Sequence, residues 1–230
     1  MLRQCRSHGH FVGSNCPECN AEGKFIMSDR EMNSIGRILA LVLRHAPEKF
    51  GIEMDINGWV NALDLSVKVQ EQRRNFHWLR KWHFEAIAST DDKGRYQVEG
   101  DMIRATYGHS LELELDLPTD NIPDELYWPC EEDAVETLLE YGITKGERKH
   151  IHLSKTIANA MEAGHVRISR PTILEVDTVR AIAEGNIIWR AGKTVFLCEG
   201  VPAEFLCKVD SDDPVIQEMV ATWEKEEEEE

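Results

Sequence analysis

The feature that most constrains the fold of this chain is a change in the spacing of its apolar residues near Ser110. Before this point, apolar residues recur three and four positions apart, at Ile35, Ile38, Leu39, Val42 and Leu43. After it, leucines alternate with mostly acidic residues at positions 111, 113, 115 and 117. The first spacing places side chains on one face of a helix, and the second places them on one face of a strand. We therefore predict two parts of different architecture with a boundary near Ser110, and a strand over 111–117.

Residues 28–110 are expected to form three helices followed by a β-hairpin, which is the pattern of a winged helix. Ser28 and Asp29 are typical of a helix N-terminus, and Ala46-Pro47 ends the same helix, so that Arg44 and His45 fall in its last turn. Further helices are expected near 59–67 and 75–88. Turn residues at 91–94 separate the expected strands 95–98 and 102–105.

Residues 111–210 predict an α+β domain with many short strands. Its strands are expected at 149–153, 165–168, 173–176, 187–190 and 195–198, and its helices at 131–141, 156–163 and 178–184. The last segment, 211–230, ends in a mostly acidic run over 224–230. This run has no apolar periodicity, which predicts a disordered tail.

The charge is distributed unevenly along the chain, whose formal net charge is −16. Residues 1–110 hold 15 Lys and Arg against 14 Asp and Glu, and the remainder holds 11 against 28. A polyanion is therefore expected to bind mainly to the first half. The longest apolar run, residues 38–43, is far shorter than the roughly 20 residues of a membrane span, and the first 25 residues are polar. We expect no membrane segment, no secretory signal, a cytoplasmic location and a monomer.

Cysteine and histidine at the N-terminus have the spacing of a metal site. Cys5 and His8 are separated by two residues, as are Cys16 and Cys19. Such spacing lets a tight turn present both ligands to a tetrahedral ion, and four protein ligands leave no position for a catalytic water. We predict a structural zinc knuckle over 1–27, with His10 as the alternative to His8. Free cysteines in a disordered arm and a disulfide are the competing interpretations.

Two basic clusters have positions that suit an anion. Arg44 and His45 lie beside an apolar helix face, where the alternative interpretation is an interaction with the helix C-terminus. On a strand, Arg148, His150 and His152 share one face. Such a face suits a phosphate or pyrophosphate, because Arg binds it in a bidentate manner and His donates protons near neutral pH. The alternative is a solvated strand edge.

A third cluster interleaves cations with aromatic residues over 73–84, which is expected to belong to the third helix. Leu79 and Trp82 are expected in the core. The cations expected to face a nucleic-acid backbone are Arg73, Arg74, Arg80 and Lys81.

Five motifs occur in a fixed order along the chain. They are Leu43-Arg44-His45-Ala46-Pro47, Trp59-Val60, Lys93-Gly94-Arg95-Tyr96, Ile103-Arg104-Ala105-Thr106-Tyr107-Gly108-His109-Ser110 and Arg148-Lys149-His150-Ile151-His152-Leu153. In this order they resemble the NAD-dependent RNA 2'-phosphotransferase family, best known as tRNA 2'-phosphotransferase. The likeness covers about residues 30–208. The Cys/His segment lies outside it and is similar to the extension of archaeal-type members.

The resemblance implies a winged-helix lobe at 28–110 and an ADP-ribosyltransferase-like lobe at 111–210, with the active site between them. Family members remove an internal RNA 2'-phosphate, as in tRNA splicing. The phosphate displaces nicotinamide from NAD, and the ribose 2''-hydroxyl then attacks phosphorus, releasing RNA and ADP-ribose 1'',2''-cyclic phosphate. The catalytic set implied here is Arg44, His45, Arg95 and Arg148. The implied NAD contacts are Gly108, His109, Ser110, His150 and His152.

Two segments depart from the family pattern. The usual Asn-Gln before Gly-His-Ser is Thr106-Tyr107 here, and the usual His-Gly-Thr is Trp128-Pro129-Cys130, in an expected loop that helps hold NAD. Two other functions compete with dephosphorylation. One is an ADP-ribosyltransferase that stops after the first step on a terminal phosphate of a nucleic acid. The other is a non-enzymatic winged-helix regulator, which would not need the four catalytic residues.

Overall fold

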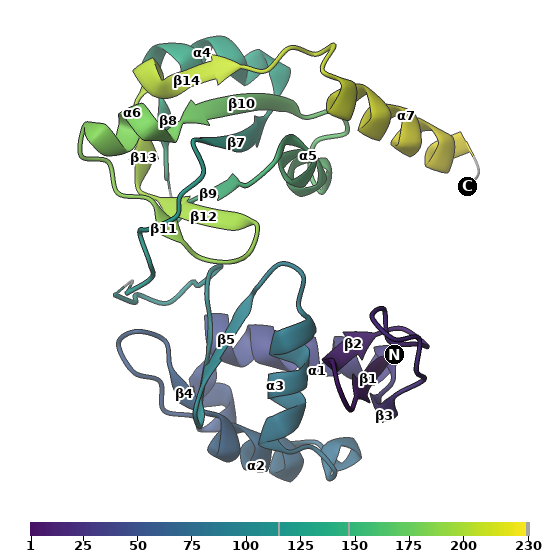
Figure 1. Ribbon diagram of the computed structural model, residues 1–230. Coiled ribbons are helices and arrows are strands. Elements are labelled where there is room, and N and C mark those ends of the chain that lie inside the picture. Colours follow the sequence, from purple (N-terminus) through teal and green to yellow (C-terminus); the bar gives the residue numbers. More distant parts are fainter. Residues whose placement is uncertain (115, 147, 229–230) are drawn as a thin grey trace. The chain divides into compact units, whose positions relative to one another are not determined.

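Figure 1 shows the protein as a computed structural model, which describes residues 1–114, 116–146 and 148–228. The chain divides into two units, Met1–Asp116 and Leu117–Glu230. Within the described residues, helices are combined with strands in several sheets, so the mixed α and β content expected from the sequence is confirmed. Among these residues, no helix has the length and apolar content to cross a bilayer.

The first unit begins with a small antiparallel sheet in the order β2-β1-β3. Its strands are β1 (Leu2–Cys5), β2 (Gly9–Val12) and β3 (Lys24–Met27). Leu2 and Met27 are fully buried and belong to the same apolar cluster as the helices of the unit. The N-terminal segment is thus packed onto the rest of the first unit.

A capping box starts the longest helix of this unit, α1 (Asp29–Arg44). The Ser28 hydroxyl accepts a hydrogen bond from the backbone N–H of Glu31, whose carboxylate accepts one from the Ser28 N–H at 2.9 Å. The apolar residues predicted for one helix face are buried at Ile35, Leu39, Val42 and Leu43. The helix ends as predicted, with Arg44 in its last turn and His45 as its C-cap.

The next helices differ in part from the expectation. They are a short 3-10 turn η1 (Pro47–Phe50), α2 (Ala62–Gln72), a second turn η2 (Arg74–Phe76) and α3 (Lys81–Thr90). The third helix was expected from residue 75, and this was wrong, because η2 inserts the buried Phe76 into the core. The helix then begins where the His83 ring accepts a hydrogen bond from the Arg80 N–H at 2.9 Å.

The predicted hairpin is confirmed as β5 (Tyr96–Glu99) and β6 (Met102–Ala105), and β6 also pairs with β4 (Val60–Asn61). The strand expected over 111–117 is wrong for the described residues, and Leu115 lies outside them. Leu111, Leu113 and Leu117 are more buried than the described acidic residues between them. The described part of the segment nevertheless makes single backbone hydrogen bonds and does not pair with another strand. The Glu114 N–H donates to the Ile56 carbonyl at 2.9 Å.

The large sheet of the second unit is antiparallel, in the order β11-β12-β9-β7-β10-β14. These strands are β7 (Glu125–Cys130), β9 (Ile151–Ser154), β10 (Thr172–Asp177), β11 (Trp189–Arg190), β12 (Val195–Cys198) and β14 (Leu206–Lys208). The remaining elements are η3 (Glu132–Ala134), α4 (Val135–Tyr141), β8 (Ile143–Thr144), α5 (Ile157–His165), α6 (Thr178–Ala183), β13 (Gly200–Val201) and η4 (Ala203–Phe205). The strand expected at 165–168 is wrong, because α5 continues to His165 and ends in a turn that bonds Arg167 and Ile168 to Gly164.

The segment Trp128-Pro129-Cys130 lies on β7, although a loop was expected there. Its residues pair with β10, with Pro129 opposite Ile173. On the other side, β7 pairs with β9 only at Tyr127 and Ser154. Pro129 therefore lies beyond the pairing with β9, where its missing N–H interrupts no ladder.

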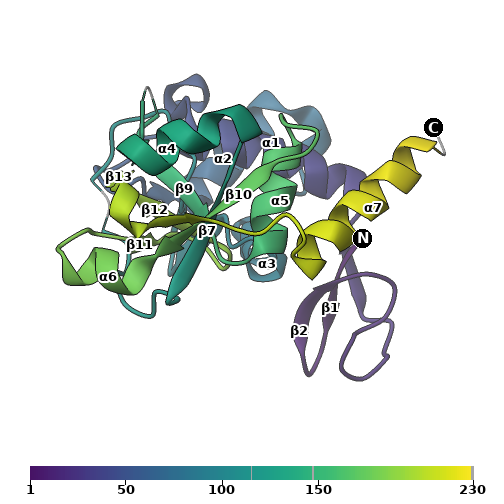
Figure 2. The same ribbon diagram turned by 90° about the horizontal axis from the view of Figure 1, so that it is seen from above.

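The expected disordered tail is also wrong over residues 224–228, which belong to α7 (Pro214–Glu228). The helix packs on α5 through Ile216, Met219, Val220 and Trp223, which recur at helical spacing. The Trp223 ring stacks on His165 with centroids 3.7 Å apart. Figure 2 shows α7 running outward from the sheet of the second unit beside α5.

Candidate active site and Cys/His cluster

The C-terminal end of α1 presents an arginine with unused hydrogen-bonding capacity. Arg44 is half-buried, and its Nε and one terminal nitrogen, Nη2, are buried without a hydrogen-bond partner in the part of the chain that the structure describes. A buried guanidinium in this state is costly unless an anion accepts its hydrogen bonds. The end of α1 is therefore a candidate anion site.

Residues 107–110 form a cradle around Arg44 and His45. The Ser110 N–H donates to the Arg44 carbonyl at 2.9 Å, and the Ser110 hydroxyl lies 3.1 Å from Nδ1 of His45. The Arg44 guanidinium lies 5.1 Å from the centre of the Tyr107 ring. Gly108 has φ +82°, and a Cβ there would lie 3.1 Å from Nη1 of Arg44. Glycine is needed at this position for both its conformation and its small size.

Arg95, at the start of the hairpin, is held in place by a buried carboxylate. Oδ1 of Asp91 accepts hydrogen bonds from Nε and Nη2 of Arg95 at 2.9 and 2.7 Å, and Oδ2 accepts one from the Arg95 N–H. Asp91 thereby raises the pKa of Arg95 further. About half of the Arg95 side chain remains exposed, at 48%. Its orientation is thus fixed while part of its charge faces outward.

Arg44 and Arg95 line one groove of the first unit, with a volume of about 880 Å³. The other walls come from β2, from a half-buried side of α1 and from the end of α3. The structure therefore brings together two of the predicted catalytic arginines. Gly108 and Ser110 both lie against Arg44, and Ser110 also contacts His45.

The predicted residues of the second unit lie at the start of β9. This strand begins at Ile151, so the strand face expected for Arg148, His150 and His152 is wrong for the first two. Arg148 is exposed in a turn, where its N–H donates to the Lys145 carbonyl at 3.0 Å, after Gly146 with φ +55°. His150 lies beside the Trp189 ring, and burial, followed by nearby Lys145, lowers its pKa. His152 is on β9 opposite Leu197.

The four cations expected to face nucleic acid do not share one helix. Arg73 follows α2, and Arg74 lies in η2. Arg80 precedes α3, with its guanidinium donating to the carbonyls of His77 and Leu79 at 2.9 and 2.6 Å. Lys81 is paired with Glu85 at 3.2 Å and with Asp101 at 2.6 Å.

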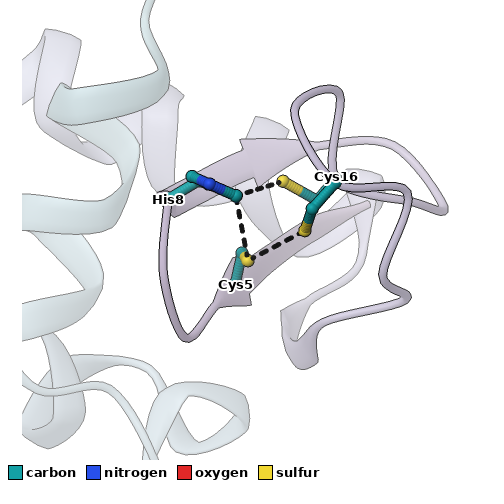
Figure 3. A group of neighbouring side chains, drawn as sticks. Cys5, His8 and Cys16 are labelled. Carbon is teal, nitrogen blue, oxygen red and sulfur yellow. Dashed lines mark hydrogen bonds between the residues drawn. The ribbon is translucent and has the colours of Figure 1, made fainter.

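The predicted metal ligands do lie together at the N-terminus. One ligand atom each from Cys5, His8, Cys16 and Cys19 lies within 4.8 Å of all the others. Figure 3 shows Cys5, His8 and Cys16 pointing toward one another, with the sulfur atoms 3.6 and 3.5 Å from Nδ1 of His8. His10 is turned away, with its Nδ1 3.0 Å from the Ser89 hydroxyl. Within the described ranges, the cysteines of the chain are free.

The electrostatics of this Cys/His cluster favour a cation. Backbone hydrogen bonds from Ser7 and His8 lower the pKa of Cys5 to about 6. Hydrogen bonds to Cys16 and Cys5 raise the pKa of His8. The first shift favours the thiolate form of Cys5, and the second follows from the contacts of the His8 imidazole with the two sulfur atoms. Three sulfur atoms and one imidazole are a donor set that fits a tetrahedral zinc ion.

Comparisons with known proteins identify the family of this chain. A model of the RNA 2'-phosphotransferase, Tpt1 / KptA family matches residues 29–200. The chain belongs to this family. The family is one of transferases that remove the 2'-phosphate from RNA using NAD. The matched region contains Arg44, His45, Arg95 and Arg148, whereas the Cys/His cluster precedes it.

Similar full-length proteins carry the same description. A probable RNA 2'-phosphotransferase of Methanosarcina acetivorans is 35% identical over 91% of this chain and 100% of its own length. Probable RNA 2'-phosphotransferase 1 of Archaeoglobus fulgidus is 36% identical over 89% of this chain and 93% of its own length. A probable RNA 2'-phosphotransferase of Thermoplasma acidophilum is 35% identical over 94% of this chain and 92% of its own length.

Sequence reasoning missed the role of Asp91. The pattern Asp91-Asp92-Lys93-Gly94 indicated a turn, which hid the fact that one of its two carboxylates is buried. Asp91 is 6% exposed, and Asp92 is exposed. The spacing of four residues between Asp91 and Arg95 was the available signal for this contact.

We predict that Asp91→Ala lowers the free energy of unfolding by about 2 kcal/mol, because it leaves donors of Arg95 without their acceptor. Asp92→Ala is the matched control and should change stability by no more than about 0.5 kcal/mol. Urea unfolding of both variants measures the difference. Equal stability of the two variants would show that the Asp91 carboxylate does not hold Arg95 in solution.

Proposed function

We propose that this protein transfers an internal 2'-phosphate of RNA to NAD. Nicotinamide is released, and the products are RNA with a free 2'-hydroxyl and ADP-ribose 1'',2''-cyclic phosphate. The observation that carries the proposal is the pair of guanidiniums in one groove. Arg44 has buried nitrogens without a partner among the described residues, and Arg95 is held by Asp91. Membership of the family supports the reaction and the use of NAD.

Arg44 and Arg95 bind the non-bridging oxygens of the 2'-phosphate in this proposal. Phosphoryl transfer depends mainly on positioning and on neutralising charge, so fixed guanidiniums are suited to it. The Asp91 carboxylate orients Arg95 in advance, and residues 107–110 do the same for Arg44. Neither arginine has to be reordered when the substrate binds.

His45 is proposed to donate a proton to the RNA 2'-oxygen as it leaves phosphorus. An alkoxide is a poor leaving group, and an acid that protonates it lowers the barrier. The Ser110 hydroxyl, 3.1 Å from Nδ1, fixes the orientation of the imidazole ring. Nε2 is then the nitrogen that is left for the substrate.

The remaining predicted site residues are proposed for NAD and the transferred phosphate. Arg148 is exposed and supplies a further guanidinium. NAD binds at Gly108, His109, Ser110, His150 and His152. The Trp128-Pro129-Cys130 segment is on a sheet strand with Cys130 buried, so it is not a loop that could supply amides to the cofactor.

The lobes implied by the resemblance are also proposals. Helices α1, α2 and α3 followed by the β5–β6 hairpin support a winged-helix lobe over 28–110. The antiparallel sheet with β9 in its interior supports an ADP-ribosyltransferase-like lobe over 111–210. RNA is proposed to contact Arg73, Arg74, Arg80 and Lys81, although Lys81 has two carboxylate partners that compete with phosphate.

The Cys/His cluster is proposed to hold a structural zinc ion. The four ligand atoms fill a tetrahedral sphere, so no position remains for an activated water. The ion would fix the loops that join β1, β2 and β3. Its contribution is then to folding of the N-terminal segment and not to the chemistry.

Incubation with an oligoribonucleotide that carries an internal 2'-phosphate tests the proposed function directly. We expect dephosphorylation and ADP-ribose 1'',2''-cyclic phosphate with NAD, and neither without it. Added divalent metal should be unnecessary, because guanidiniums neutralise the phosphate charge. With NAD labelled in the adenylate, an ADP-ribosylated nucleic acid as the final product would favour the transferase that stops after the first step.

Arg95→Ala and Arg148→Ala should each reduce kcat by about 100- to 1000-fold, because each removes a donor to the transition state. The corresponding lysine variants should recover part of the loss, since lysine restores the charge but not the planar fork. Single-turnover kinetics measure the effect, and thermal unfolding verifies the fold. Arg167→Ala, an exposed arginine of the second unit, is the control. Full activity of Arg95→Ala would contradict the assignment.

Zinc should co-purify at about one ion per chain and be lost in Cys16→Ser and Cys19→Ser, since four ligands are needed to close the site. Cys207→Ser removes an exposed cysteine outside the cluster and should retain the ion. Elemental analysis of protein purified without chelator measures the metal. Metal-free wild-type protein, or retention of zinc by both cluster variants, would contradict the site.

A further inference from the structure

The groove that contains Arg44 and Arg95 extends well beyond them, toward the N-terminal segment. Its far wall is formed by His10, Phe11 and Val12 of β2 together with Pro17. This wall belongs to residues that precede the region matched by the family model. The N-terminal segment therefore shapes a surface that begins at the proposed catalytic arginines.

The floor of the groove is a half-buried side of α1. Met32, Gly36, Ala40 and Arg44 follow one another along this side at helical spacing. The distance from Met32 to Arg44 along the axis is about 18 Å, at about 1.5 Å per residue. A stacked strand rises about 3.4 Å per nucleotide, so about five nucleotides fit this length.

The charge of the groove suits a polyanion. Arg37 and Lys93 line it in addition to Arg44 and Arg95. The acidic side chains among its lining residues are Asp91, which is bonded to Arg95, and Asp92. The cationic groups thus exceed the anionic ones, although the whole chain has a net charge of −16.

We infer that this groove binds the RNA strand on one side of the 2'-phosphate, with the phosphate at Arg44 and Arg95 and the flanking nucleotides along α1 against the N-terminal segment. The inference rests on the proposed function and names a specificity surface for it. Continuity with the two arginines selects RNA as the occupant, because the chain attached to a bound 2'-phosphate must leave this end of the groove. Residues proposed for NAD do not line it.

Gly36 offers a way to block the groove without disturbing the fold. A Cβ added at this position meets no atom within 4 Å. A larger residue in the helix also avoids the entropic cost of glycine. Gly36→Trp therefore fills the groove, whereas Gly36→Ala adds one methyl group and serves as its control.

Arg37 offers a test of the charge. Arg30 lies on the same helix and is also exposed, but it does not line the groove. Arg37→Ala and Arg30→Ala are thus a matched pair that removes the same charge from α1. A phosphate contact at Arg37 should also appear in the salt dependence, whose slope falls by about 0.7 when one contact to a single strand is lost.

The experiment compares three 2'-phosphorylated oligoribonucleotides with NAD: a short one with a single nucleotide on each side, one extended only on the 5' side and one extended only on the 3' side. We expect wild-type kcat/KM to be higher for one of the extended substrates. Gly36→Trp should abolish this gain, and Arg37→Ala should reduce it by up to about fivefold. Both should leave turnover of the short substrate unchanged, as should Gly36→Ala and Arg30→Ala for every substrate.

Equal kcat/KM for the three substrates, or a gain that persists in Gly36→Trp and Arg37→Ala, would overturn the inference while leaving the proposed function intact. A change of oligomeric state in Gly36→Trp without a kinetic effect would also overturn it, in favour of a second copy of the chain as occupant. Absence of turnover by the wild type would refute the proposed function. Anisotropy of a labelled extended oligonucleotide with the same variants would then still decide whether the groove binds RNA.

Discussion

Burial of one face of α1 is the interaction on which the first unit depends. Ile35, Leu39, Val42 and Leu43 are fully buried, and together they fix the rotation and the end of the helix. Each such side chain contributes roughly 1.5–3 kcal/mol when it is removed from water. Because the helix is anchored this firmly, Arg44 can keep buried nitrogens without partners in the described structure. Apolar packing thus offsets the cost of an electrostatically incomplete site.

Much of the first unit was predictable because local signals and tertiary packing agree there. Ser28 and Ala46-Pro47 bound α1 as expected, and the turn at Asp91-Asp92-Lys93-Gly94 leads into the hairpin. The errors have physical reasons. Phe76 is apolar and suited a helical pattern, but it is buried from a 3-10 turn. The leucines near residue 113 alternate as in a strand, but no partner strand is available to their segment among the described residues.

In the candidate site, the sequence indicated the candidate catalytic residues but not the residues that orient them. The family resemblance carried by the order of motifs implied Arg44, His45, Arg95 and Arg148, and the chemistry of guanidinium and imidazole groups agrees with that set. Asp91 was hidden, since a carboxylate in a turn is usually solvated and only the structure distinguishes it from Asp92. The acidic tail was wrongly predicted to be disordered, although residues 224–228 belong to α7. Its glutamates obscured an apolar stripe ending at Trp223, which anchors α7 on α5.

The two proposals for the N-terminal segment have different physical bases. Zinc binding would depend on four ligand atoms that lie within 4.8 Å of one another, whereas RNA binding would depend on the outer face of β2 and the open side of α1. The two are coupled through packing. Leu2 and Met27 tie the small sheet to the core that holds α1, so a change in the loops around the metal would be transmitted to a wall of the groove. On this argument the ion would affect which RNAs bind while taking no part in the reaction itself.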